Sequence, residues 1–253
     1  MKKANIYMLV VLGLISIQSN CRNSYKLTAK FESDTSNTFP DVSLPGNPDG
    51  DRIDWYGSSN SMLQVVSRTN SEGETSNWLQ LNQTTNDPQF YPGLLSFVPA
   101  PETSDGVGYT VNWKGYIDVP LGADNLLDIL VSVSEGESHR SDRVISFAMR
   151  PERLVDGERS RKYGIYLLEN GSYSNTALGY VRTGGPHSIS IFLFKETREY
   201  HIVGFGETIV RNFPEEIELN RPSLHFIFDG FPGIGVYRMD NVFILQGDRT
   251  ISE

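Results

Sequence analysis

The sequence predicts an all-β fold, a two-sheet antiparallel β-sandwich (jelly roll) that forms a single domain after a signal peptide. Three observations carry this prediction. Short runs of alternating apolar and polar residues recur along the chain, and turn-forming residues separate them. After residue 30, no apolar pattern of helical period extends over more than about ten residues. The 253 residues include 23 glycines and 13 prolines, which indicates many turns.

The clearest predicted strand runs from Tyr109 to Val119. Successive side chains of a strand point to opposite faces, so one set here is apolar and contains Trp113. Ten or more short strands in about 220 residues fit two packed sheets. The polar set of this strand comprises Asn112, Lys114, Tyr116 and Asp118, and further strands are expected at 62–67, 77–82, 127–133, 143–149, 163–168, 188–195, 200–205, 224–228 and 236–245.

The first twenty residues have the pattern of a secretory signal peptide. A basic start at Lys2 and Lys3 precedes an apolar run over residues 6–17, which is shorter than the ~20 residues that span a bilayer. The only cysteine, Cys21, follows directly. This pattern resembles that of bacterial lipoproteins, although Gln18 and Asn20 depart from the usual lipobox.

The resemblance implies that Cys21 is lipidated and that the protein is anchored to a membrane of the bacterial cell envelope, at the outer membrane or cell surface. The alternative is a plain secreted protein. The chain is thus expected to comprise a signal peptide (1–20), a tether (21–30), the jelly-roll domain (31–247) and a tail (248–253).

Composition excludes several classes of partner and site. The formal net charge is −9, and it becomes −11 when Lys2 and Lys3 leave with the signal. Nucleic acids and anionic membrane surfaces require basic patches, so no nucleic-acid partner is expected. A single cysteine excludes both a disulfide within the chain and a Cys-rich zinc site.

The two ends of the predicted domain carry a paired pattern. The domain opens with Phe31-Glu32, followed by the Gly-rich segment 44–51, and closes with Asp240-Asn-Val-Phe-Ile244. These motifs resemble those of concanavalin A-like and carbohydrate-binding-module jelly rolls of exported bacterial proteins. The resemblance implies adjacent first and last strands. It also implies a structural calcium with Glu32 and Asp240 as ligands, joined by Asp49 or Asp51, since calcium prefers carboxylate and carbonyl oxygens. Alternatively, Glu32 and Asp240 only accept backbone hydrogen bonds at strand ends.

No known catalytic signature occurs in the sequence. The histidines at 139, 187, 201 and 225 form no zinc motif. The stretch 215–220 lacks the Glu-x-Asp-x-x-Glu pattern of jelly-roll glucanases, and the Gln-Ile-His strand of jelly-roll lyases is missing. These observations favour binding over catalysis.

A sugar site on a sandwich combines aromatic rings with amide and charged groups. Two predicted strand faces have this composition, and they would form one groove if both strands lay in the same sheet. The leading hypothesis is therefore non-catalytic binding of a glycan or extracellular matrix. A structural or adhesion subunit that binds a surface protein, and a divergent polysaccharide lyase or glycoside hydrolase, are the alternatives. The candidate residues are Trp78, Gln80 and Asn82 on one strand and Asn112, Lys114 and Tyr116 on the other.

Overall fold

A computed structural model shows an all-β protein with two antiparallel sheets, as the sequence predicts. No helix occurs among the described residues, and hence none there that could cross a membrane. The structure describes residues 26–32, 34–38, 40, 52–56, 63–70, 72–83, 93–98, 108–119, 128–135, 143–153, 159–219, 221–229 and 235–246.

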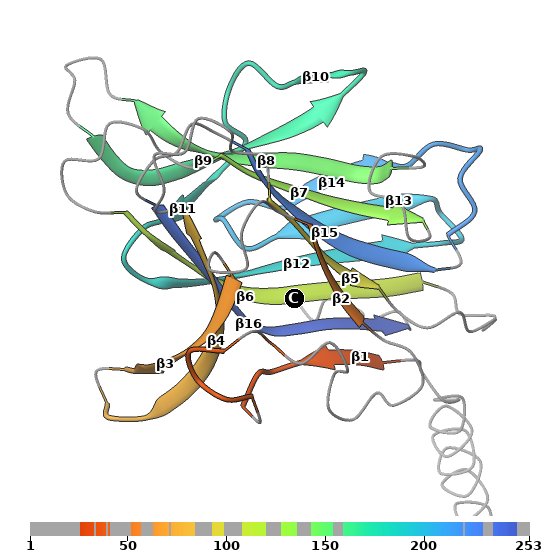
Figure 1. The fold of residues 1–253 in the computed structure, drawn as a ribbon. Coiled ribbons are helices and arrows are strands. Elements are labelled where there is room, and N and C mark those ends of the chain that lie inside the picture. Colours follow the sequence, from red (N-terminus) through yellow and green to blue (C-terminus); the bar gives the residue numbers. More distant parts are fainter. Residues whose placement is uncertain are drawn as a thin grey trace, which may run out of the picture.

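Within the described residues each sheet contains eight strands, which Figure 1 labels. Sheet A has the order β14 (Ile209–Asn212), β13 (Glu199–Val203), β12 (Pro186–Phe194), β6 (Gly108–Asp118), β16 (Gly235–Gln246), β4 (Thr75–Gln83) and β3 (Leu63–Thr69), and β1 (Lys26–Ala29) also pairs with β16. Sheet B has the order β10 (Ser172–Tyr173), β9 (Arg159–Glu169), β8 (Arg143–Arg153), β7 (Asp128–Glu135), β15 (Pro222–Asp229), β5 (Gly93–Val98) and β2 (Arg52–Tyr56), and β11 (Tyr180–Arg182) also pairs with β9.

The strand β16 organises sheet A because it pairs with three other strands. Its first half pairs with β4 and its second half with β1, while β6 runs along its other side. The register on β6 shifts between Asp240 and Phe243, where Asn241 adopts a positive φ of 50°. This bulge lies where β16 changes partner from β4 to β1.

The first and last described strands lie side by side, in the arrangement that the family resemblance implies. In β1, Leu27 pairs with Ile244 and Ala29 pairs with Val242, and all four side chains are buried. Residues 26–29 therefore belong to the folded sheet, although the sequence placed them in a tether. The segment KLTA is too short to show a strand period in the sequence.

All ten strands predicted from alternation are present. The turn predicted at Asn170-Gly171 joins β9 and β10, and both residues have positive φ, as a type I′ hairpin requires. The strands that the sequence did not predict are β1, β2, β5, β10, β11 and β14.

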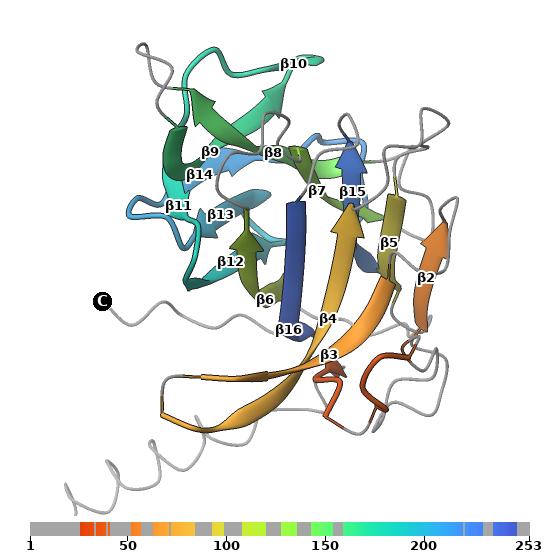
Figure 2. The same ribbon diagram turned by 60° about the vertical axis from the view of Figure 1, so that its left-hand side comes forward.

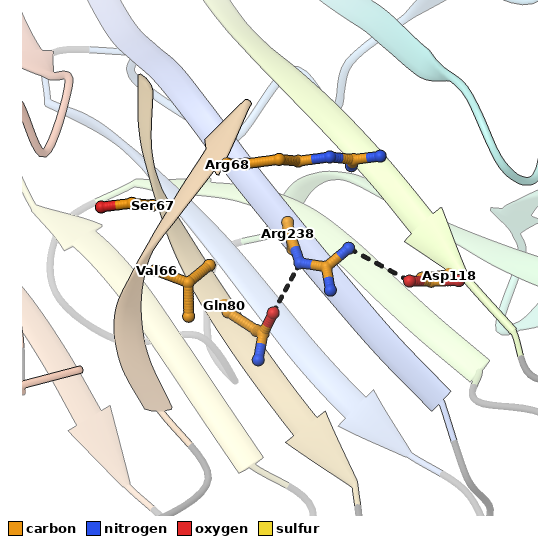
Figure 3. A pocket seen from close by; sticks show the side chains of 6 residues that line it. All are labelled: Val66, Ser67, Arg68, Gln80, Asp118 and Arg238. Atoms are coloured by element: carbon orange, nitrogen blue, oxygen red, sulfur yellow. Dashed lines mark hydrogen bonds and ion pairs between the residues drawn. The ribbon is translucent and has the colours of Figure 1, made fainter. Parts of the chain in front are cut away.

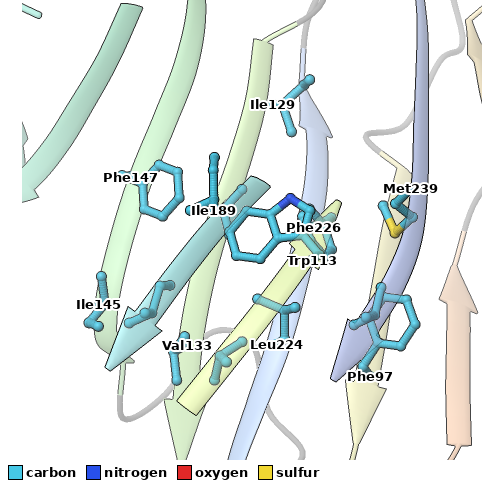
Figure 4. Packing of buried hydrophobic residues seen from close by; sticks show 14 of the residues in the cluster. Phe97, Trp113, Ile129, Val133, Ile145, Phe147, Ile189, Leu224, Phe226 and Met239 are labelled. Atoms are coloured by element: carbon cyan, nitrogen blue, oxygen red, sulfur yellow. The ribbon is translucent and has the colours of Figure 1, made fainter. Parts of the chain in front are cut away.

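Aromatic side chains join the two sheets at the centre of the core (Figure 4). Trp113 of β6 is fully buried; its ring stacks on Phe147 at 6.4 Å and meets Phe226 edge-on at 5.2 Å, and both partners belong to sheet B. The indole Nε1–H donates a 2.8 Å hydrogen bond to the hydroxyl of Tyr237 in β16. A Cβ at Gly115 would overlap this hydroxyl and the His187 ring, so β6 needs glycine there.

The bond between Trp113 and Tyr237 is expected to stabilise the fold. The change Tyr237→Phe keeps the ring but leaves the buried indole N–H without a partner, so it should lower the free energy of unfolding by about 1–3 kcal/mol. Tyr163→Phe is the matched control, because the buried Tyr163 hydroxyl has no hydrogen-bond partner among the described residues. Burial raises the pKa of both phenols. Denaturant unfolding measures the stability of both variants. An equal loss of unfolding free energy in the two variants would contradict a stabilising bond between Trp113 and Tyr237.

Candidate functional site

The two predicted polar faces lie on one side of sheet A, the side opposite the core. In β4, Leu79 and Leu81 enter the core, so Trp78 and Gln80 point to the outer face. In β6, Trp113 and Ile117 enter the core, so Lys114 and Tyr116 also point outward. The strand β16 lies between β4 and β6, and its Arg238 is paired in register with both Gln80 and Tyr116.

Arg238 lies at the centre of this face and connects the neighbouring strands (Figure 3). Its Nε donates to Gln80 Oε1 at 2.5 Å, and its Nη1 lies 3.2 Å from Asp118 Oδ2. The Arg238 side chain is 17% exposed and that of Asp118 is 49% exposed. One guanidinium therefore links an amide on β4 to a carboxylate on β6, one on either side of β16, at the solvent boundary.

These residues line a hollow of about 230 Å³. The hairpin of β3 and β4 forms one side of it and projects beyond the neighbouring strands of the sheet (Figure 2). The hollow is smaller than the pockets of about 300–1,000 Å³ that drug-sized ligands occupy. The lining residues are Val66, Ser67, Arg68, Gln80, Asp118 and Arg238.

Arg68 reaches from β3 across the sheet to β6. Three strand spacings of about 4.8 Å separate β3 from β6, a distance of roughly 14 Å in a flat sheet. Nevertheless Cζ of Arg68 lies 3.5 Å from the centre of the Tyr116 ring. Figure 3 shows the extended Arg68 side chain passing over the hollow near Arg238.

The two candidate aromatic rings do not present open faces. Trp78 is 5% exposed and Tyr116 is 8% exposed. Lys114 Nζ lies 5.0 Å from the Trp78 ring centre, and the guanidiniums of Arg68 and Arg238 lie over Tyr116 at 3.5 Å and 5.5 Å. The outward-facing groups are therefore cations held over the rings by cation–π attraction.

Of the two predicted asparagines, only Asn112 has a described side chain. Asn112 lies on the outer face of β6, but its Nδ2 donates to Ser190 Oγ at 2.7 Å and to the Ile189 carbonyl at 3.1 Å. This amide thus connects β6 to β12. Asn82 belongs to β4, and its side chain lies outside the described residues.

Sequence reasoning missed Arg68 and Arg238 as site residues. Arg238 alternates with the buried Tyr237 and Met239, so its outward direction could have been read from the sequence. Arg68 lies beyond the predicted strand 62–67, and the sequence carries no signal that its side chain reaches β6.

The candidate calcium ligands are only partly within the described residues. Asp240 is buried, and both its carboxylate oxygens accept hydrogen bonds from Asn241, at 2.7 Å from the backbone and 2.8 Å from the side chain. Glu32 accepts a bond from the Asn77 backbone at 3.2 Å. Burial, together with repulsion from Glu32, raises the pKa of Asp240 to about 6. Asp49 and Asp51 lie outside the described residues.

The described residues alone do not complete a calcium site. They contain no group of three or more His, Cys, Asp or Glu side chains that could hold a metal, whereas calcium takes six to eight oxygens. A bound cation would favour the ionised form of Asp240, whose pKa burial raises to about 6, and calcium at this position stays a prediction.

Calcium binding is expected to raise the melting temperature, and a chelator to lower it. Asp240→Asn should abolish this calcium effect. In chelator at pH 7.5 the same change should not destabilise the fold, because the raised pKa makes the ionised Asp240 unfavourable above about pH 6. Thermal melts of both proteins, with calcium and with chelator, measure this. Identical wild-type melts in the two conditions would count against calcium.

The described histidines make hydrogen bonds or packing contacts inside the protein. His225 is fully buried between two serine hydroxyls, with Ser96 Oγ at 2.7 Å from Nδ1 and Ser223 Oγ at 2.6 Å from Nε2. Burial lowers the pKa of His187 to about 4, so its ring is neutral at physiological pH. The ring of His201 packs against Phe194 at 4.7 Å.

Comparison with solved structures gives the fold. The chain is similar to a sialidase (12% identity, TM-score 0.52), covering 87% of this chain but only 18% of the sialidase. It is also similar to peanut lectin with a 9mer peptide (10% identity, TM-score 0.51, 89% of this chain and 98% of the lectin). A third similar structure is a carbohydrate esterase from Shiga toxin-encoding bacteriophage phi24B (10% identity, TM-score 0.50, 77% of this chain and 90% of the esterase).

These likenesses show the two-sheet jelly-roll fold. No protein-family model matches the chain, and no curated protein matches its sequence.

Proposed function

We propose that this chain is an exported carbohydrate-binding protein that holds a glycan by equilibrium binding on the outer face of sheet A. The observation that carries the proposal is the hollow around Arg238, where an amide, a carboxylate and two guanidiniums converge beside the Tyr116 ring. Sugar hydroxyls are bonded by such sets of planar donors and acceptors. The lectin-like fold agrees with this use of the sheet.

Arg238→Gln is expected to weaken glycan binding at least tenfold. The change removes a charge-assisted hydrogen-bond donor, and such bonds contribute about 1.5–3 kcal/mol each. Arg211→Gln is the matched control, because it removes the same charge from a different strand. Arg211 belongs to β14 and pairs with Glu169 at 2.6 Å. A glycan array identifies ligands, and calorimetry compares the variants. Absence of any glycan signal, or equal affinity in both variants, would refute the proposed site.

We further propose that Cys21 carries a lipid that anchors the domain to a bacterial cell-envelope membrane. The support is the signal-like pattern of residues 1–20 and the position of Cys21 shortly before β1, which begins at Lys26. Cys21→Ser is expected to abolish labelling by a fatty-acid probe and to release the protein from the membrane fraction. Labelling that persists in the variant would contradict lipidation.

A further inference from the structure

The centre of the proposed site is a cationic patch on an acidic protein. The chain has a formal net charge of −9, yet Arg68, Lys114 and Arg238 gather on one face from three strands of sheet A. Two of them, Arg68 and Arg238, line the same hollow. Local charge, more than net charge, determines which ligand enters such a site.

The aromatic rings beneath these cations position them without neutralising them. A ring face attracts a cation through its quadrupole, so Arg68 keeps its full charge at 3.5 Å from the Tyr116 ring. The same holds for Lys114 over Trp78. A neutral pyranose that stacked on either ring would first have to displace its cation.

The carboxylates of the site do not balance all of this charge. Asp118 pairs with Arg238, and Asp240 lies opposite Lys114 in the register of β16 and β6. Within the described part of the chain, Arg68 has no carboxylate partner. The described residues also offer no acceptor to Nη2 of Arg238, whose Nε and Nη1 are already bonded.

We propose that the hollow binds an acidic glycan, with an anionic group of the sugar held between Arg68 and Arg238. This inference rests on the proposed function and names its ligand class. Guanidinium groups bind planar carboxylates through paired N–H donors, so a uronic acid fits the site directly. Asp118 is then placed to accept hydrogen bonds from the sugar hydroxyls, while Gln80 accepts from Arg238 and keeps the guanidinium in position beside the anion.

A matched pair of ligands tests this inference with the full-length protein. Calorimetry at low salt compares an oligogalacturonate with the same oligomer fully methyl-esterified, which keeps the sugar and removes the charge. The acidic form should bind at least tenfold tighter, and its affinity should fall as sodium chloride is added. The affinity for a sulfated oligosaccharide shows whether the site recognises sulfate as well as carboxylate. The affinity for oligoglutamate of equal charge shows whether an acidic peptide binds as well as the acidic glycan.

The variant Arg68→Met removes one charge while its side chain can still cover Tyr116. It should weaken oligogalacturonate binding about tenfold and weaken binding of the methyl ester much less, with Arg211→Met as control. Equal affinity for acid and ester would overturn the inference, and so would equal affinity for oligoglutamate. If only neutral glycans bind, and Arg238→Gln weakens them, the proposed function is supported and the inference of an acidic ligand is refuted. If no glycan binds, both are refuted.

Discussion

The structure depends on the packing of Trp113 between the sheets and on its hydrogen bond to Tyr237. These two residues belong to β6 and β16, the adjacent central strands of sheet A. Phe147 and Phe226 hold the indole from sheet B. Because side chains alternate along a strand, fixing the inner residues of β6 and β16 also fixes which residues point outward. The core therefore sets the direction of Tyr116 and Arg238.

Much of the fold could be predicted because long strands with one buried face carry a period of two. β12, with 9 residues, shows it in its burial, and β16 shows it on either side of its bulge. The missed strands lack this signal for two physical reasons. β10, β11 and β14 have 2, 3 and 4 residues, which is too short to show a period of two. In β5, adjacent leucines at 94 and 95 obscure the alternation.

The site could be predicted in part. Alternation alone indicates that Trp78 and Tyr116 leave the core, but it does not give the order of the strands. β16 comes from the end of the chain and places Arg238 between the two predicted faces. Arg68 reaches Tyr116 across strands that the sequence does not reveal to be neighbours. The sequence thus indicates an aromatic site, whereas the structure has cations above the rings.

The most direct measurement of the central claim is a crystal structure of the complex with trigalacturonate. The account predicts a uronate carboxylate in the hollow, within hydrogen-bond distance of the guanidiniums of both Arg68 and Arg238, about 2.7–3.2 Å. It also predicts that Arg68 still covers Tyr116. A sugar ring stacked directly on Trp78 or Tyr116 with its carboxylate in solvent, or a ligand bound on sheet B, would contradict it.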